Sequence, residues 1–338
     1  MSDIVNVFDG DAFSNTSLST SQNGKPPFNA LITSQGWFQE VPIATTIAVI
    51  EYNNEKLGLI PATPRGGAGT KGDRGKRKAV NVSVPHFEVV DTLFWNDIVG
   101  VRKFGSTDTI SGAQEVLGPM LLNQRRELEA SIEYGLLGAV LGSTIYPAGS
   151  TYADIDWFTT MGVTQTSVDM QLDHSDTKIV SGKCGDIIHA IQDAAMGIPV
   201  TRVAALVDRL MFASLIGHAD VNSYNAAFNP MFSPAKMENP IAARYVNVGG
   251  ITFYEYYNNV GGDLFLEENS GIAFPADPGF FVSAVAPGDI KEAVGTIGQR
   301  FYVDQREVKK GVEFSTQSNV LSYPVVPATL IALTTAHS

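Results

Sequence analysis

The sequence IPATPRGGAGTKGDRGKRK, residues 60–78, is the most unusual stretch of the chain. Its last fourteen residues, 65–78, contain five glycines, six basic residues and one acid, which gives a net charge of +5. Because glycine leaves the backbone free and like charges repel one another, we expect an extended loop. A solvated loop without a partner remains the alternative. The candidate contact residues are its six cations: Arg65, Lys71, Arg74, Lys76, Arg77 and Lys78.

Strand-like segments lie on both sides of this loop. Residues 43–52 are rich in β-branched side chains, and Asn53-Asn54 can turn the chain so that residues 56–60 return as a hairpin. After the loop, valines alternate with other residues over 79–90, which is typical of a strand. The sequence therefore predicts a hairpin region over residues 43–90 that contains the basic loop.

The chain as a whole is acidic and sparsely charged. Its 338 residues carry a net charge of −12, and only 17% are charged, against roughly a quarter in an average soluble domain. Outside the basic loop the net charge is −17. Since 44% hydrophobic residues suffice for a sizeable core, the surface must be polar but uncharged, or covered by something else.

Composition and termini argue against several classes of protein. No apolar run reaches the roughly 18 residues of a membrane helix, and the N-terminus lacks the basic and apolar regions of a secretory signal. The single cysteine, Cys184, excludes an intrachain disulfide, which fits a reducing compartment. The global acidity argues against a general nucleic-acid binder.

Residues 1–42 are rich in Ser, Thr, Asn and Pro, with scattered aromatic residues and too little periodic apolar content for a buried element. We expect an extended arm that docks its aromatic side chains elsewhere, for example on another subunit. A frayed terminus over residues 1–25 is the alternative.

Residues 108–142 form the strongest helix candidate, which is long for a compact domain. Apolar residues at helical spacing form one stripe: Ala113, Leu117, Leu121, Leu128 and Ile132. Charged residues are expected mostly on the other side: Arg125, Arg126, Glu129 and Glu133. Beyond Tyr134 the helix is apolar all round, and Gly142 is the expected stop.

Helices and strands alternate from residue 180 onwards. A helix over 184–196 is followed by a buried strand over 203–207, and Asp208 caps a helix over 209–216. Further strands are predicted over residues 245–257, 271–274, 299–308 and 312–333. Pro324 and Pro327 make the last stretch irregular or place it at a sheet edge.

The glycine-rich loop does not predict a nucleotide site. Gly67 to Gly72 matches G-x-G-x-x-G, but the dinucleotide motif requires a helix after the glycines and a strand follows here. The P-loop motif fails because Gly75-Lys76 is followed by Arg77 instead of Ser or Thr. We predict no cofactor site, so a cofactor-dependent enzyme is the weaker alternative.

Other chemistry-bearing residues also have ordinary explanations. No two of the five histidines have H-E-x-x-H spacing, and Cys184 with His189 lacks a third group for a metal or nucleophile site. The carboxylate pairs Asp154/Asp156 and Glu267/Glu268 are expected to be solvated. We predict neither catalytic nor metal-binding residues.

A nucleic-acid-binding module acting through loop 65–78 is the alternative function. Its cations could contact phosphates. However, the loop has no aromatic residues for base stacking, and the remaining charge of −17 would repel a nucleic acid. An acidic protein surface is the better partner, and a copy of the same chain supplies one.

Several segments, in order along about residues 40–338, resemble the major capsid protein E family of tailed bacteriophages, the lambda-type coat proteins. The specific block reads IPATPRGGAGTK at 60–71, KRKA at 76–79, VPH at 84–86 and GVRKFG at 100–105. LLNQRRELE at 121–129 and the ending, from VEFS at 312–315 to ATL at 328–330, are also similar. The N-terminal arm matches least well.

The resemblance implies an α+β fold of the HK97 type. It assigns an N-terminal arm to residues 1–42 and an extended hairpin, the E-loop, to residues 43–90. A peripheral domain follows over 91–179, with a spine helix at 109–142, and an axial domain over 180–290. The C-terminal strands, 291–338, are expected to return to the peripheral domain.

The implied function is that of a non-catalytic major head protein. Copies would form pentamers and hexamers and close an icosahedral shell around double-stranded DNA, which is packaged without sequence specificity. Further implied partners are a scaffolding protein, a portal ring and, optionally, a decoration protein, with no cofactor or membrane. The expected location is the virion capsid, and the host cytoplasm during assembly. Because the chain begins close to the arm, we expect the scaffolding protein to be separate.

Overall fold

The computed structural model describes residues 13–25, 30–52, 78–99, 109–173, 179–221, 244–256 and 266–335. Most of the basic loop (65–77), the return strand expected at 56–60, and the GVRKFG segment lie outside these residues.

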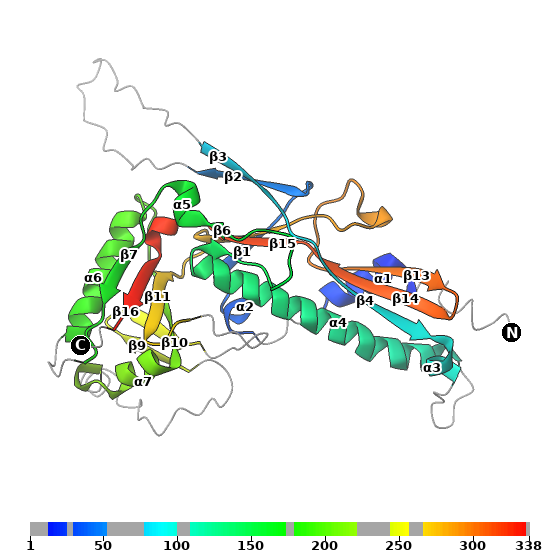
Figure 1. Cartoon of the computed structure of the whole chain (residues 1–338), viewed down its shortest axis with the longest axis horizontal. Coiled ribbons are helices and arrows are strands. Elements are labelled where there is room, and N and C mark those ends of the chain that lie inside the picture. Colours follow the sequence, from blue (N-terminus) through cyan, green and yellow to red (C-terminus); the bar gives the residue numbers. More distant parts are fainter. Residues whose placement is uncertain are drawn as a thin grey trace, which may run out of the picture.

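One long helix, α4 (Thr109–Val140), runs along the molecule and contacts most of its other layers (Figure 1). Its 32 residues correspond to about 48 Å at 1.5 Å per residue. The predicted stripe is buried at Leu117, Leu121, Leu128 and Ile132, and the end beyond Tyr134 is buried as expected. Pro119 lies inside this helix, which begins ten residues earlier at Thr109.

Two three-stranded sheets pack along α4. The first has the order β13–β14–β4 and the second the order β1–β12–β15. The strands of the first are Tyr302–Val308, Gly311–Ser318 and Phe87–Phe94, and those of the second are Phe38–Pro42, Phe281–Val285 and Val320–Pro324. Pro324 ends β15, an edge strand, and Pro327 begins a 3-10 turn (Pro327–Thr329), as the sequence predicts.

A six-stranded sheet lies beyond the C-terminal end of α4 (Figure 1), with the order β7–β16–β11–β8–β10–β9. These strands are Thr166–Asp169, Ile331–Thr334, Ser270–Pro275, Val203–Val207, Ile251–Glu255 and Tyr245–Val248. Helices α6 (Ile179–Ala194) and α7 (Arg209–Gly217) pack on one face.

Strand β8 is buried on both faces of this sheet. Val203, Ala205 and Val207 pack towards α6 and α7, whereas Ala204 and Leu206 join the core that contains the end of α4. Alternate side chains of a strand point to opposite faces, so an unbroken apolar run is the pattern of a strand between two cores. The predicted cap is confirmed, because the Asp208 carboxylate accepts hydrogen bonds from the amides of Leu210 and Met211.

The C-terminal strands divide between sheets, which differs from the expected return to one domain. β13 and β14 pair with each other and with β4, but β16 pairs with β11 and β7 in the six-stranded sheet. β7 lies within the range expected to be peripheral. Strands from the ranges 91–179 and 291–338 therefore pair in the same sheet as strands from the range 180–290.

The N-terminal region contains buried elements, so the expectation of an arm without them is wrong for its described part. It forms α1 (Asn15–Asn23), α2 (Leu31–Gln35) and strand β1. Phe13 and Trp37 are buried in the chain's own core, not on another subunit. Short helices with little apolar periodicity form here because α1 is capped by Ser14 and both helices pack on the rest of the chain.

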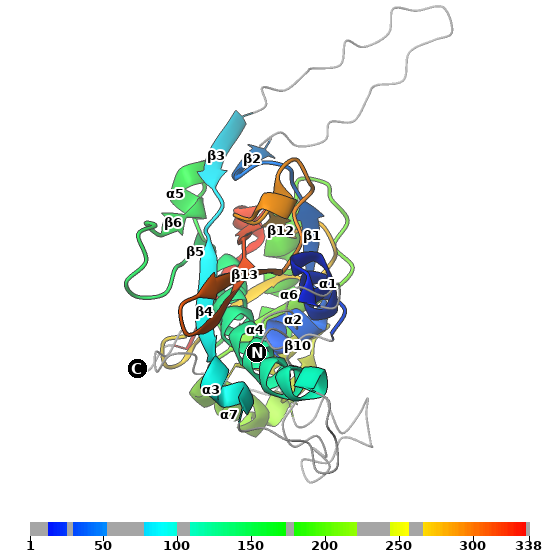
Figure 2. The ribbon, with the colours of Figure 1, turned by 90° about the vertical axis from the view of Figure 1, so that its right-hand side faces the viewer.

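Strand β2 (Ile47–Tyr52) pairs antiparallel with β3 (Lys78–Ser83), from Ile47 opposite Ser83 to Tyr52 opposite Lys78. The described partner of β2 thus follows the basic loop instead of preceding it. This hairpin extends away from the body of the molecule (Figure 2).

Gly142, the predicted stop of α4, provides a test of this packing. Its φ is +85°, and a Cβ atom there would lie 2.2 Å from the Phe158 ring in α5 (Trp157–Met161). Gly149 has φ +87° but open space around it, so it is a matched control. We expect Gly149→Ala to lower the free energy of unfolding by about 1–2 kcal/mol, and Gly142→Ala by roughly 1–3 kcal/mol more. Urea unfolding of the unassembled chain measures both; equal losses would contradict the close packing at Gly142.

Candidate functional site

The structure separates the cysteine and histidine considered as a nucleophile pair. Cys184 is fully buried in α6, whereas His189 is exposed on the same helix. Burial, with a smaller contribution from the Asp220 charge, raises the pKa of the Cys184 thiol to about 12. The thiol therefore stays protonated at neutral pH and cannot act as a thiolate nucleophile.

The other polar groups that the sequence singled out have local structural roles. Asp154 accepts a hydrogen bond from the Tyr146 amide at 3.0 Å, and Asp156 caps α5 by accepting from the Phe158 amide at 3.0 Å. Glu267 and Glu268 are exposed. No cluster of three or more potential metal ligands occurs among the described residues, and no described helix has both the length and the apolarity to span a membrane.

Of the six candidate contact residues in the basic loop, only Lys78 belongs to the described residues. It is exposed and lies opposite Tyr52 at the outer end of the β2–β3 hairpin. Arg65, Lys71, Arg74, Lys76 and Arg77 lie outside the described residues.

The root of the hairpin, where β2 and β3 join the body, is buried on one face and exposed to solvent on the other. Ala48, Ile50 and Val82 are buried in a cluster with Trp157 of α5. On the opposite face of β2, Ile47 and Val49 are 47% and 61% exposed. A hairpin held in place by its root, with apolar side chains exposed along it, is suited to contact another molecule.

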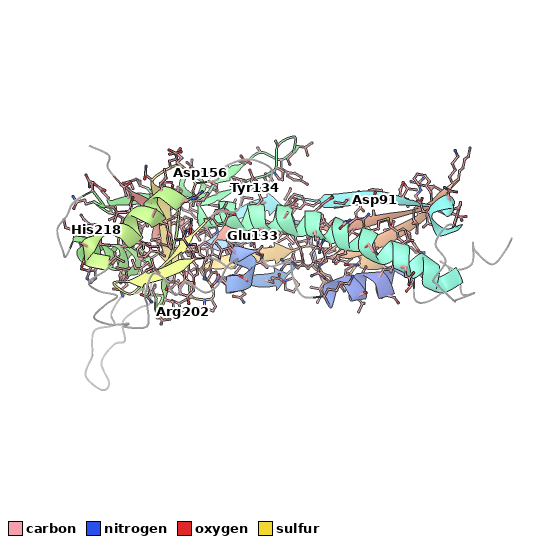
Figure 3. The ribbon with its side chains drawn as sticks, turned by 90° about the horizontal axis from the view of Figure 1, so that it is seen from below. Asp91, Glu133, Tyr134, Asp156, Arg202 and His218 are labelled. Carbon is pink, nitrogen blue, oxygen red and sulfur yellow. The ribbon has the colours of Figure 1, made fainter. Side chains whose placement is uncertain are left out.

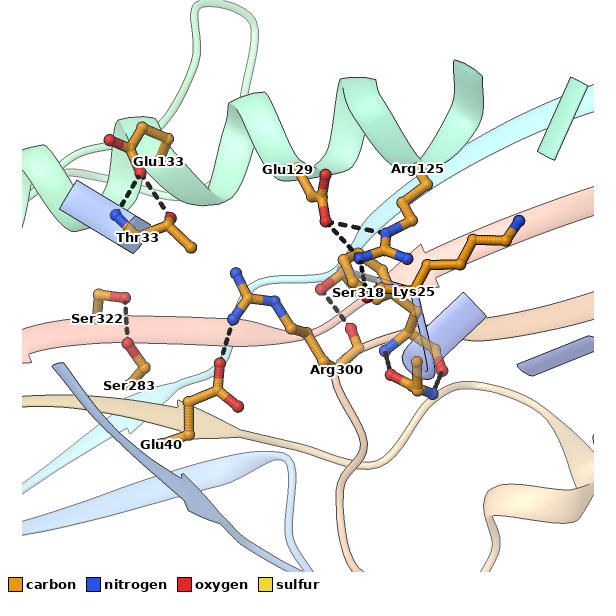
Figure 4. Close-up of polar contacts among 12 residues, drawn as sticks. Lys25, Thr33, Glu40, Arg125, Glu129, Glu133, Ser283, Arg300, Ser318 and Ser322 are labelled. Atoms are coloured by element: carbon orange, nitrogen blue, oxygen red, sulfur yellow. Dashed lines mark hydrogen bonds and ion pairs between the residues drawn. The ribbon is translucent and has the colours of Figure 1, made fainter. Parts of the chain in front are cut away.

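A buried ion pair within α4 lies beneath the N-terminal segment, to which its arginine donates hydrogen bonds (Figure 4). The Arg125 and Glu129 side chains are only 4% and 6% exposed, and Arg125 Nη2 lies 2.8 Å from Glu129 Oε1. The guanidinium also donates to the carbonyl oxygens of Gln22 and Lys25 and lies over the Phe301 ring at 5.1 Å. One side chain thus connects the end of α1, the long helix and the strand β13 region.

Glu133 lies two turns from Arg125 on α4 (Figure 3), and its carboxylate binds the start of α2. Its carboxylate oxygens accept hydrogen bonds from the Ile32 amide at 2.7 Å, the Thr33 amide at 3.1 Å and the Thr33 hydroxyl at 2.7 Å. These amides lie in the first turn of α2 and have no carbonyl partner within that helix, so the carboxylate satisfies them. Burial is the main cause that raises the pKa of Glu133, although these hydrogen bonds and the Arg300 charge act against it.

The burial of these charges differs from what the sequence predicts. Four charged residues were expected mostly on the side opposite the apolar stripe, but Arg125, Glu129 and Glu133 are buried beneath the N-terminal segment and only Arg126 is exposed. The spacing of Arg125 and Glu129, four residues apart, predicts an ion pair. Their burial depends on partners about a hundred residues earlier in the chain, which no local pattern indicates.

We predict that Arg125→Met destabilises the unassembled chain by on the order of 3–5 kcal/mol, because it removes the guanidinium that compensates the buried Glu129 charge. The double variant Arg125→Met/Glu129→Leu should lose less, since neither charge remains. Arg126→Met, next to it on the exposed side, should change stability by less than about 0.5 kcal/mol. Urea unfolding of the four chains measures this, and an Arg125→Met loss as small as that of Arg126→Met would contradict the role assigned to the pair.

A second prediction concerns pH. Folding raises the pKa of the Glu133 carboxyl group. Its contribution to stability is therefore fully present at a pH below its pKa in the unfolded chain, and it is lost as the pH rises through its pKa in the folded chain. Glu133→Gln has no charge to bury at any pH. The unfolding free energy of the wild type relative to Glu133→Gln should therefore fall from acidic to neutral pH, as urea unfolding at several pH values can show. A difference that grows with pH would contradict burial as the main cause.

Comparisons with known proteins agree with this arrangement. The model of the family described as "Phage major capsid protein E" matches residues 14–335. The major capsid protein of Salmonella phage Felix O1 (isolate Felix O1-VT1) is 21% identical over 336 residues, which cover 89% of this chain and 90% of that protein.

The fold has a solved counterpart. A crystal structure described as that of a prophage capsid protein from E. coli CFT073 matches with a TM-score of 0.57 at 14% identity and covers 98% of this chain and 97% of that one. The fold is therefore the α+β capsid fold of the HK97 type, as the resemblance implied. The role is structural and non-enzymatic, and copies associate into a capsid shell. The chain belongs to the phage major capsid protein E family.

Proposed function

We propose that copies of this chain form pentamers and hexamers and close an icosahedral shell around double-stranded DNA. The observation that carries this proposal is the β2–β3 hairpin, which extends from the body with a fixed root and an exposed apolar face at Ile47 and Val49. Because this face is exposed within the described part of the chain, we expect it to lie on a neighbouring subunit.

The hairpin combines two kinds of contact. Burial of its apolar strand face would stabilise the contact by about 25 cal/mol per Å² of apolar surface. The cations of loop 65–78, from Arg65 to Lys78, would meet the acidic surface of the neighbour, because the rest of each chain carries −17. Each contact is small, but every subunit repeats it around a closed ring, so the assembled shell is stable.

The domain division also belongs to this proposal. We place the peripheral domain around α4 and the β13–β14–β4 sheet, and the axial domain around the six-stranded sheet with α6 and α7. β7 and β16 are part of that six-stranded sheet, so we assign them to the axial domain, contrary to their order in the chain.

The remaining partners follow from the family resemblance. They are a separate scaffolding protein, a portal ring, optionally a decoration protein, and packaged DNA bound without sequence specificity, with assembly in the host cytoplasm. The alternative function, a nucleic-acid-binding module acting through loop 65–78, has no observation in its favour among the described residues.

The assembly itself is tested by expressing the chain alone and with a scaffolding protein from the same phage, and examining the products by electron microscopy. Closed shells with five-fold and six-fold clusters are the expected result. A chain that stays a compact monomer under all these conditions would overturn the proposal.

The hairpin's role has its own test. Reversal of Arg74, Lys76, Arg77 and Lys78 to Glu should reduce shell yield strongly and leave the unfolding of the free chain almost unchanged. The control reverses four basic residues elsewhere: Lys183, Arg209, Lys309 and Lys310. Both variants change the net charge equally, so an equal yield from both would count against a specific contact of the hairpin loop.

A further inference from the structure

The loop between β12 and β13, residues 286–301, is drawn in orange in Figure 1. It exposes two apolar side chains. Val294 is 82% and Ile297 is 62% exposed, more than any other large apolar residue among those described. They lie on either side of Gly295 and follow a short 3-10 helix, η4 (Lys291–Ala293). We call this segment the β12–β13 loop.

Hydrogen bonds and a small buried cluster fix the β12–β13 loop to the strands next to it. The Tyr302 hydroxyl accepts a hydrogen bond from the Gln299 amide at 2.7 Å, and the Gln317 side chain accepts one from the Asp289 amide at 2.9 Å. Ile290 and Ala293 form a buried cluster with the Tyr302 side chain. Val294 and Ile297 are therefore presented in a fixed arrangement, which lowers the entropy cost of burying them in a contact.

A pocket of about 400 Å³ opens at the foot of the same loop. Residues 298–301 line it together with Lys25, Arg125 and Glu40. Arg125 is paired with Glu129 and Arg300 with Glu40, but Lys25 has no ion-pair partner among the described residues, and none is drawn for its ammonium group in Figure 4. Arg300 Nε is also buried without a hydrogen-bond partner among the described atoms.

These donors suit an anion. Partial burial, and then the nearby Arg125 charge, lower the pKa of Lys25, so an anionic partner would stabilise its charged form. A protein surface suits the apolar loop beside the pocket better than a nucleic-acid backbone, whose outer surface is dominated by charged phosphates. A copy of this chain fits both needs, since its 35 acidic residues outnumber its 23 basic ones and its copies associate into shells.

We propose that the β12–β13 loop and the adjoining pocket form a contact surface for a second copy of the chain, which covers Val294 and Ile297 and places a carboxylate beside Lys25 and Arg300. This inference rests on the proposed function and adds a second contact to that of the hairpin. The two surfaces are connected, because the Gly298 amide donates to the carbonyl of Ile43, which lies between β1 and β2 in the segment that leads into the hairpin.

The chain offers a direct test, because its single cysteine, Cys184, is buried. Ile297→Cys adds one exposed thiol. A maleimide reagent should label it in the free chain and react at least about ten-fold more slowly in assembled shells, where a neighbour covers it. Equal labelling rates in free chains and shells would overturn the contact.

Assembly provides the second readout. We expect Val294→Ser/Ile297→Ser to raise the concentration needed for shell assembly by about ten-fold or more, whereas Val294→Ile, which keeps the apolar surface, should assemble like the wild type. Ile198→Ser is the control for loss of an exposed isoleucine elsewhere, since Ile198 is 46% exposed. An effect of Ile198→Ser equal to that of the double variant would overturn the assignment. So would a wild-type yield from the double variant, which leaves the proposed function standing.

Lys25→Gln separates a protein carboxylate from DNA as the anion. Weaker assembly of empty shells is the expected result. Unchanged empty-shell assembly with poorer DNA retention would overturn the contact between copies and assign the pocket to DNA. Urea unfolding of each free variant confirms that the chain still folds. If the wild type itself forms no shells, the proposed function and this contact fail together.

Discussion

The buried Arg125–Glu129 pair is the interaction on which the position of the N-terminal segment depends. A buried guanidinium is costly to desolvate unless its donors are satisfied, and here they are shared between Glu129 and the carbonyls of Gln22 and Lys25. The geometry holds only if α1, α4 and the start of β13 meet at one place. The pair therefore determines where these distant segments meet as well as stabilising the folded chain. Glu133, one helical turn beyond Glu129, fixes the position of α2 in the same way.

This arrangement explains how a helix of 32 residues is accommodated in a chain of moderate size. Along its length α4 is covered in turn by the N-terminal helices, two small sheets and the six-stranded sheet. Two elements extend beyond the layers that pack around α4: the β2–β3 hairpin and the β12–β13 loop. Both present apolar side chains on rigid supports, as expected for a subunit whose flanks meet other subunits.

Local patterns predicted those elements that local physics determines. The stripe on α4, the unbroken apolar run of β8 and the cap at Asp208 all depend on residues a few positions apart. The N-terminal helices were missed because their stability comes from Glu133, Arg125 and Val303, which lie 100 or more residues away. The burial of charged residues on α4 was mispredicted for the same reason. The block at residues 60–105 indicated the family, but it did not indicate the roles of single residues.

The surface of the chain is poorer in charge than its composition indicates. Part of the 17% lies inside, since Arg125, Glu129, Glu133 and Asp208 are buried. The exposed excess is acidic, while cations gather in loop 65–78 and around the pocket at Lys25. An acidic surface with a few cationic sites attracts copies of itself only in particular orientations. Specific orientation with weak general repulsion is what repeated assembly requires, because a subunit that bound its copies in every orientation would aggregate before it closed a shell.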